Sequence, residues 1–118
     1  MSGAGDRVGR TAELEVPADR FEPRLIAWAK AAECKCTGRG PVRWTFRRGG
    51  FLGGWPKGDI DRLPTEAAVE VVSEVPFTIR ASLEIRFGNR MSSRGEDEAD
   101  VDQRLGLMLA YLRGVYDF

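Results

Sequence analysis

The chain has 118 residues, of which 42% are hydrophobic and 31% are charged, and its 18 basic and 18 acidic residues give a formal net charge of zero. This length and composition are typical of one folded domain with a single core, and they exclude a fully disordered chain. The sequence contains no histidine, which excludes Ser-His-Asp and Cys-His catalysis. No apolar run approaches the roughly 20 residues of a membrane-spanning helix, and the first residues lack the apolar core of a secretory signal, so we expect a cytoplasmic protein without membrane association.

The first residues predict a tail followed by a strand. Residues 1–10 are rich in glycine and charge and predict a flexible tail, so the single folded domain is expected to cover residues 11–118. Apolar and polar side chains alternate from Thr11 to Val16, as in a half-buried strand.

An amphipathic helix is predicted after this strand. It begins at Asp19 or Glu22 and ends near Glu33, and Pro23 suits its first turn because the missing N–H costs nothing there. Its apolar positions recur at helical spacing, at Leu25, Trp28, Ala29 and Ala32.

Two cysteines, Cys34 and Cys36, follow the helix at C-x-C spacing. A disulfide between them would be strained, and redox and zinc sites use C-x-x-C, usually with a second pair. We therefore predict two reduced thiols at a helix end. The alternative is a metal ion shared across an oligomer interface.

A second strand is predicted over Val42–Arg48, with Trp44 and Phe46 on one face and Arg43 and Arg47 on the other. The glycine-rich residues that follow predict a loop.

Beyond this loop, the sequence predicts a very short strand over residues 59–62 and then a short helix from Pro64 to Ser73. Pro64 and Glu66 suit the start of a helix, although the β-branched valines that follow disfavour it. Asp59 and Asp61 lie two residues apart, and such a carboxylate pair serves in acid–base chemistry or magnesium binding in other proteins, yet is common without either role.

The clearest strand is Phe77–Phe87, where apolar and polar residues alternate without interruption. After a polar loop, the last helix runs from Glu96 to about Val115, and the acidic residues 96–102 match a helix start better than a calcium loop. Its apolar positions are Val101, Leu105, Met108, Leu109, Leu112 and Tyr116. This order of elements predicts an α+β fold, a small, mainly antiparallel sheet with two or three helices packed on one face.

The region between Cys34 and Gly58 contains six basic residues, several aromatic residues and no acidic residue. Basic and aromatic side chains together can follow a phosphate backbone and stack on bases. If Trp44 and Phe46 belong to the core, the same pattern is only a solvated basic strand face. The candidate partner-binding residues are Arg43, Arg47, Arg48, Phe51, Trp55 and Lys57.

Residues 42–75 resemble a short module of tailed-phage and prophage proteins with the pattern G-D-x-x-x-L-P-x-x-x-A. The matching residues are Gly58, Asp59, Leu63, Pro64 and Ala68. The resemblance implies a small helix that starts at Leu-Pro and packs on a sheet. It also implies a phage or mobile-element protein of structural or accessory type, without catalytic residues and associated with the virion if not cytoplasmic.

These observations favour a non-enzymatic interaction module that binds a protein partner or self-assembles as a homo-oligomer. The alternative is a nucleic-acid-binding protein that uses the basic and aromatic stretch 35–57. A third hypothesis is an enzyme that uses Asp59, Asp61 or a cysteine. We predict no catalytic residues, no metal site and no small-molecule cofactor.

Overall fold

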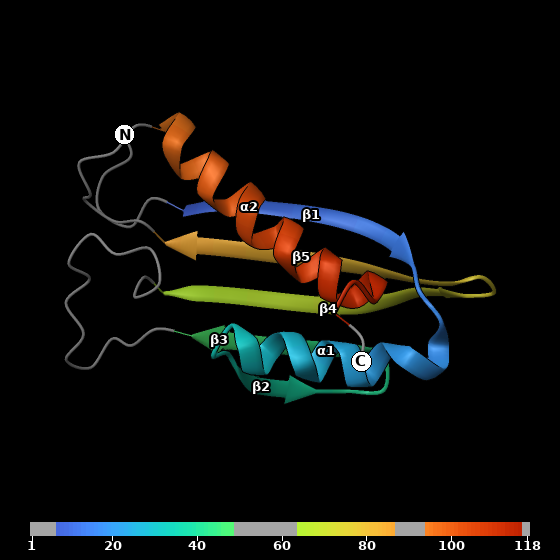
Figure 1. Cartoon of the computed structure of the whole chain (residues 1–118). Helices are drawn as coiled ribbons and strands as arrows, with labels where there is room; N and C mark the ends of the chain where they lie inside the picture. Colours follow the sequence, from blue (N-terminus) through green and yellow to red (C-terminus); the bar gives the residue numbers. More distant parts are fainter. Residues whose placement is uncertain (1–6, 49–63, 87–93, 117–118) are drawn as a thin grey trace.

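The computed structural model describes residues 7–48, 64–86 and 94–116 (Figure 1). These residues form one five-stranded antiparallel sheet in the order β1-β5-β4-β3-β2, with two helices packed on one of its faces. The elements along the chain are β1 (Arg7–Glu15), α1 (Ala18–Ala31), β2 (Lys35–Arg39), β3 (Arg43–Arg48), β4 (Thr65–Glu74), β5 (Phe77–Arg86) and α2 (Arg94–Arg113). The predicted α+β class, with an antiparallel sheet and helices on one face, is confirmed.

Strand β5 lies between β1 and β4 and carries the middle of the core. Apolar and polar residues alternate along β5 as predicted. The apolar residues Ile79, Ala81, Leu83 and Ile85 are buried beneath the helices. Phe77 is only half-buried, because it lies at the end of the strand next to the β4–β5 turn.

The sheet begins earlier in the chain than the sequence predicts. Residues 7–10 were expected in a flexible tail, and this expectation is wrong, because β1 starts at Arg7. Val8 pairs with Ile85 and is 2% exposed, so its burial holds this end of the strand in place. The alternation predicted for residues 11–16 is confirmed, with Leu14 and Val16 buried.

Helix α1 packs against β3 through aromatic side chains. Phe21 meets Trp44 edge-on with ring centroids 5.1 Å apart, and Trp28 meets Phe46 in the same way at 5.5 Å. Both rings of β3 therefore lie in or against the core, as the alternation predicts. Pro23 lies one turn further inside the helix than expected, since α1 already begins at Ala18.

Strand β2 was not predicted, because residues 35–39 show no alternation of apolar and polar side chains. They form an edge strand beside β3, in which every side chain is exposed or half-buried. The reversal after α1 passes through Glu33, whose backbone φ is 60°.

The helix predicted from Pro64 to Ser73 is wrong, and so is the small helix implied by the phage-module resemblance. These residues form β4, which pairs with β3 on one side and β5 on the other. Thr65, Ala67 and Val69 are buried at period two, which is the spacing of a strand. The residues 59–62 predicted as a short strand lie outside the described residues.

Helix α2 crosses the β1 and β5 side of the sheet and meets α1 at one end (Figure 1). Its predicted core positions Val101, Leu105, Met108 and Leu112 are buried. Where the two helices meet, Arg24 of α1 donates a hydrogen bond to the Leu112 carbonyl of α2 at 3.2 Å. From there the two helices diverge toward the end of the sheet where α1 ends and β3 ends (Figure 1).

Candidate functional site

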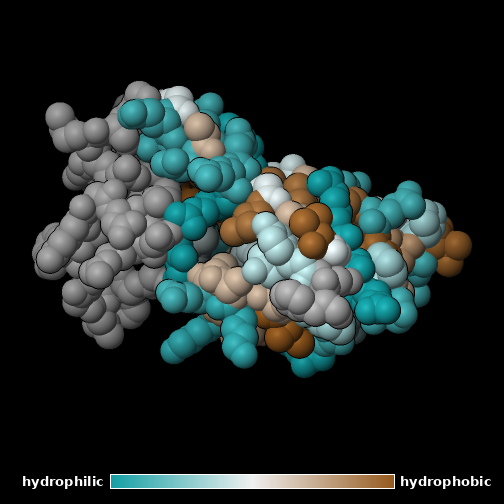
Figure 2. All heavy atoms as spheres, viewed as in Figure 1, coloured by the Kyte–Doolittle hydropathy of each residue, from teal (hydrophilic) through white to brown (hydrophobic). Residues whose placement is uncertain are grey.

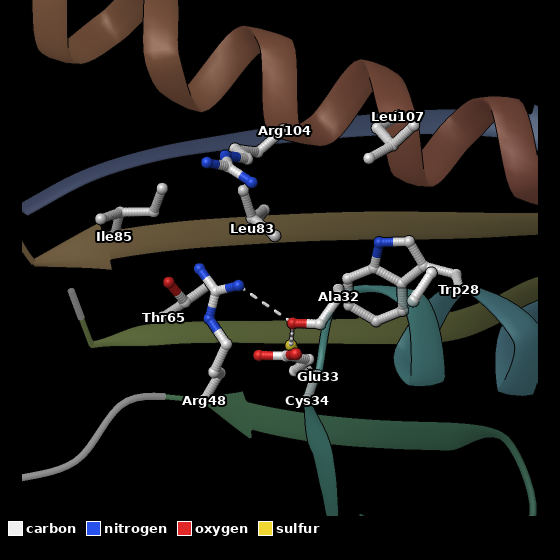
Figure 3. Close-up of a pocket in the computed structure, with 11 residues that line it drawn as sticks. Trp28, Ala32, Glu33, Cys34, Arg48, Thr65, Leu83, Ile85, Arg104 and Leu107 are labelled. Atoms are coloured by element: carbon white, nitrogen blue, oxygen red, sulfur yellow. Dashed lines mark hydrogen bonds between the residues drawn. The ribbon is translucent and has the colours of Figure 1, made fainter. Parts of the chain in front are cut away.

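A cavity of about 250 Å³ lies where the two helices diverge, between them and the sheet (Figure 3). We call it the helix–sheet cavity. Its apolar walls come from α1, β5 and α2, and consist of Trp28, Ala31, Ala32, Leu83, Ile85 and Leu107. Its polar lining groups are Glu33, Cys34, Arg48, Thr65 and Arg104.

Arg48 is the last residue of β3, and its side chain extends from the sheet toward the end of α1 (Figure 3). Its Nη1 donates a hydrogen bond to the Ala32 carbonyl at 3.0 Å. That carbonyl lies at the C-terminus of α1, where exposed carbonyls favour a positive charge. The Nε of Arg48 is buried and has no hydrogen-bond partner in the structure.

The Cys34 thiol shares this corner of the cavity. Its Sγ lies 3.8 Å from the same Ala32 carbonyl, and the side chain is half-buried. Burial raises the pKa of the Cys34 thiol, and the nearby positive charge of Arg48 offsets part of that rise. Cys34 is therefore a protonated thiol at neutral pH. Cys36 is exposed on β2, and both cysteines are free, as predicted.

The other polar lining groups come from three different segments. Thr65 is 4% exposed at the start of β4, and Arg104 reaches the cavity from α2, across from Arg48 (Figure 3). Glu33 lies at the rim, on the turn that follows α1. The lining thus combines two guanidinium groups with one carboxylate.

The opposite face of the sheet carries the other arginines of the predicted partner-binding set. Arg47 forms an ion pair with Glu66 of β4 at 3.0 Å, and Arg43 lies directly across from Glu70. Arg48 is one residue further along β3 and therefore faces the helices, so the structure does not place it on the same face as Arg43 and Arg47. Phe51, Trp55 and Lys57 lie outside the described residues, as do Asp59 and Asp61.

The structure thus brings Arg48 together with residues that the sequence did not connect to it. Arg48 has the same strand parity as Trp44 and Phe46, which was a signal that it points toward the core side. Nothing in the sequence indicated that Arg104 of α2 lies opposite, because that depends on how α2 crosses the sheet.

Figure 2 shows the face on which the helices lie, where apolar surface is visible between polar side chains. Apolar atoms also gather at the far end of the β4–β5 hairpin, where Val75 is 91% exposed. Within residues 7–48, 64–86 and 94–116, no helix is long and apolar enough to cross a membrane.

Comparison with protein-family models and with curated proteins finds no match. Among solved structures, the chain is similar to a protein of Nitrosospira multiformis determined in a structural genomics programme, with a TM-score of 0.51 and 15% identity over 92% of this chain and 94% of that one. It is also similar to a chain of Mycobacterium smegmatis described as a START superfamily protein, with a TM-score of 0.48 and 10% identity over 92% and 94% of the two chains. At these identities, the first similarity shows the fold and nothing more.

Proposed function

We propose that the protein binds a small, mainly apolar molecule in the helix–sheet cavity. The observation that carries the proposal is the cavity itself, whose apolar walls come from three elements that the fold holds apart. The cavity, of about 250 Å³, is partly open to solvent, and its inner wall includes the buried core residues Leu83 and Ile85. A ligand that enters it would bury apolar surface against the core.

The size of the cavity limits the class of ligand. An engineered apolar cavity of about 150 Å³ in another protein holds benzene. The helix–sheet cavity, at about 250 Å³, has room for a substituted benzene ring or a short alkyl chain with a polar end. It lies below the usual range of roughly 300–1,000 Å³ for drug-sized ligands, which argues against a nucleotide or a large lipid.

The chemistry of the lining supports binding more directly than catalysis. Trp28, Leu83 and Leu107 offer apolar contact area. Arg48, Thr65, Glu33 and Cys34 lie near one another, and Arg104 faces them from α2 (Figure 3). Apolar walls with a few convergent polar groups are the usual composition of a small-molecule site.

Titration with two neutral probes, octanamide and phenylacetamide, tests this proposal by calorimetry and by amide chemical shifts in nuclear magnetic resonance spectra. We expect saturable binding with shifts at the end of α1 and in β5. The variant Ala31→Trp places a large ring at the cavity lining and should weaken binding at least tenfold. The matched control Ile26→Trp puts the same ring on the same helix at a position that is 60% exposed, and should bind like wild type. Lack of binding by both probes, or equal binding by both variants, contradicts the proposal.

The interaction with a protein partner or nucleic acid through the basic stretch stays a prediction. Two arginines of that stretch, Arg43 and Arg47, face away from the helices, and Arg47 already forms an ion pair with Glu66. Binding to a mixed oligonucleotide that weakens by orders of magnitude between low and moderate salt would support the nucleic-acid alternative.

A further inference from the structure

We infer that the molecule bound in the helix–sheet cavity carries a carboxylate, and that Arg48 binds it; this inference rests on the proposed function. The starting observation is the state of the Arg48 guanidinium group. One nitrogen atom, Nη1, donates to the Ala32 carbonyl, whereas Nε is buried and lacks an acceptor. Among the described residues, no carboxylate lies within ion-pair distance of Arg48.

A role in capping α1 accounts for only one nitrogen atom of Arg48. A guanidinium group presents five N–H donors in a planar fork, and a carboxylate matches two of them at once. Nε has almost no solvent-accessible surface, so the donors that a ligand in the cavity would reach belong to the Nη atoms. Beyond the bond from Nη1 to the Ala32 carbonyl, the described residues supply no acceptor for these donors.

The charge of Arg48 points to an acid rather than to a neutral acceptor. Arg48 is a permanent cation without a carboxylate partner among the described residues, and Glu33 at the rim is the one carboxylate of the lining. An acid bound with its carboxylate near Arg48 would leave its apolar part toward Trp28 and Leu107, on the opposite side of the view in Figure 3. In this arrangement the carboxylate lies beside Arg48 and the apolar part of the ligand lies against Trp28 and Leu107.

The test compares acids with their amides, which have nearly the same shape. We expect wild-type protein to bind octanoate and phenylacetate about tenfold or more tightly than octanamide and phenylacetamide at low salt, because charge-assisted hydrogen bonds are the stronger ones. Arg48→Gln keeps a donor for the Ala32 carbonyl but removes the charge. It should bring the ratio of acid to amide affinity close to 1. Arg47→Gln, on the other face of the same strand, is the matched control and should keep the wild-type ratio.

A second variant tests the same charge balance without touching the cap of α1. Glu33→Gln should raise the ratio of acid to amide affinity severalfold, because it removes the negative carboxylate at the rim. If Arg48→Gln fails to fold, the wild-type ratio and the Glu33→Gln variant decide. Equal affinity for acids and amides in wild type overturns the carboxylate inference and leaves the proposed function intact. Failure of the amides and the acids alike to bind overturns the proposed function first.

Discussion

The arginines on the two faces of the sheet have different surroundings. On the open face, Arg47 pairs with Glu66, Arg80 pairs with Glu13 and Glu70, and all of these groups are substantially exposed. On the helix-covered face, Arg48 is half-buried and has no carboxylate partner among the described residues. The adjacent residues Arg47 and Arg48 therefore belong to different electrostatic environments.

This difference shows that a cluster of basic residues in a sequence does not by itself identify a binding surface. Ion pairs across neighbouring strands neutralise much of the open face, and in water they contribute little to stability. Arg48 on the covered face has no carboxylate partner among the described residues and lies beside apolar walls, where its interaction with a ligand is less screened by solvent.

The largest expected effect concerns the covered face. Ile79 is fully buried in the middle of β5, away from the cavity, so Ile79→Ala should reduce the free energy of unfolding by about 2–5 kcal/mol. Arg80→Ala changes the next residue, on the open face, and should cost about 1 kcal/mol or less because its ion pairs are exposed. Urea unfolding measures both. Similar losses for the two variants would contradict the assignment of the core to the helix-covered face.

The elements that the sequence predicted correctly differ from those that it did not in the regularity of their apolar patterns. β5 and α2 have long, regular apolar patterns, and both were predicted within a few residues. β4 was mistaken for a helix, because Pro64 and Glu66 suit a helix start, whereas its strand conformation depends on pairing with β3 and β5 on both sides. β2 has no apolar alternation and forms an edge strand only because β3 supplies a partner.

The candidate site was less predictable than the fold. Strand parity alone places Arg48 on the same face as Trp44 and Phe46, so its orientation could have been predicted. The cavity could not, because it depends on the divergence of α1 and α2 and on the turn at Glu33 that returns the chain to the sheet.

A smaller effect is expected for the ion pairs of the open face. A double-mutant cycle with Arg47→Ala and Glu66→Ala should give a coupling free energy of about 0.2–1 kcal/mol, reduced at high salt, because both side chains are more than half exposed. The cycle is measured by urea unfolding at low and high ionic strength. A coupling free energy well above this range would mean that the ion pairs of the open face stabilise the fold more than their solvent exposure indicates.

The Cys34 thiol allows a direct comparison of Arg48 and Arg47. In a Cys36→Ser background, Cys34 is the one remaining thiol, and its alkylation by iodoacetamide follows the thiolate fraction. Burial raises the pKa of Cys34 above its ordinary value of 9.0, so the rate should reach half its plateau at a pH higher than 9.0.

Arg48→Gln removes the charge that lowers the Cys34 pKa, so the midpoint of this pH profile should move further upward. Arg47→Gln should leave the midpoint unchanged, since its charge lies on the other face of the sheet and is paired with Glu66. Because the pKa is higher in the folded state than in the unfolded state, the thiol stabilises the folded state below the ordinary value. This stabilisation should be lost as the pH rises above 9.0 toward the folded-state pKa. Equal pH profiles for the Arg48 and Arg47 variants would show that the Arg48 charge does not act on the cavity. The two arginines would then not differ in their electrostatic effect on Cys34.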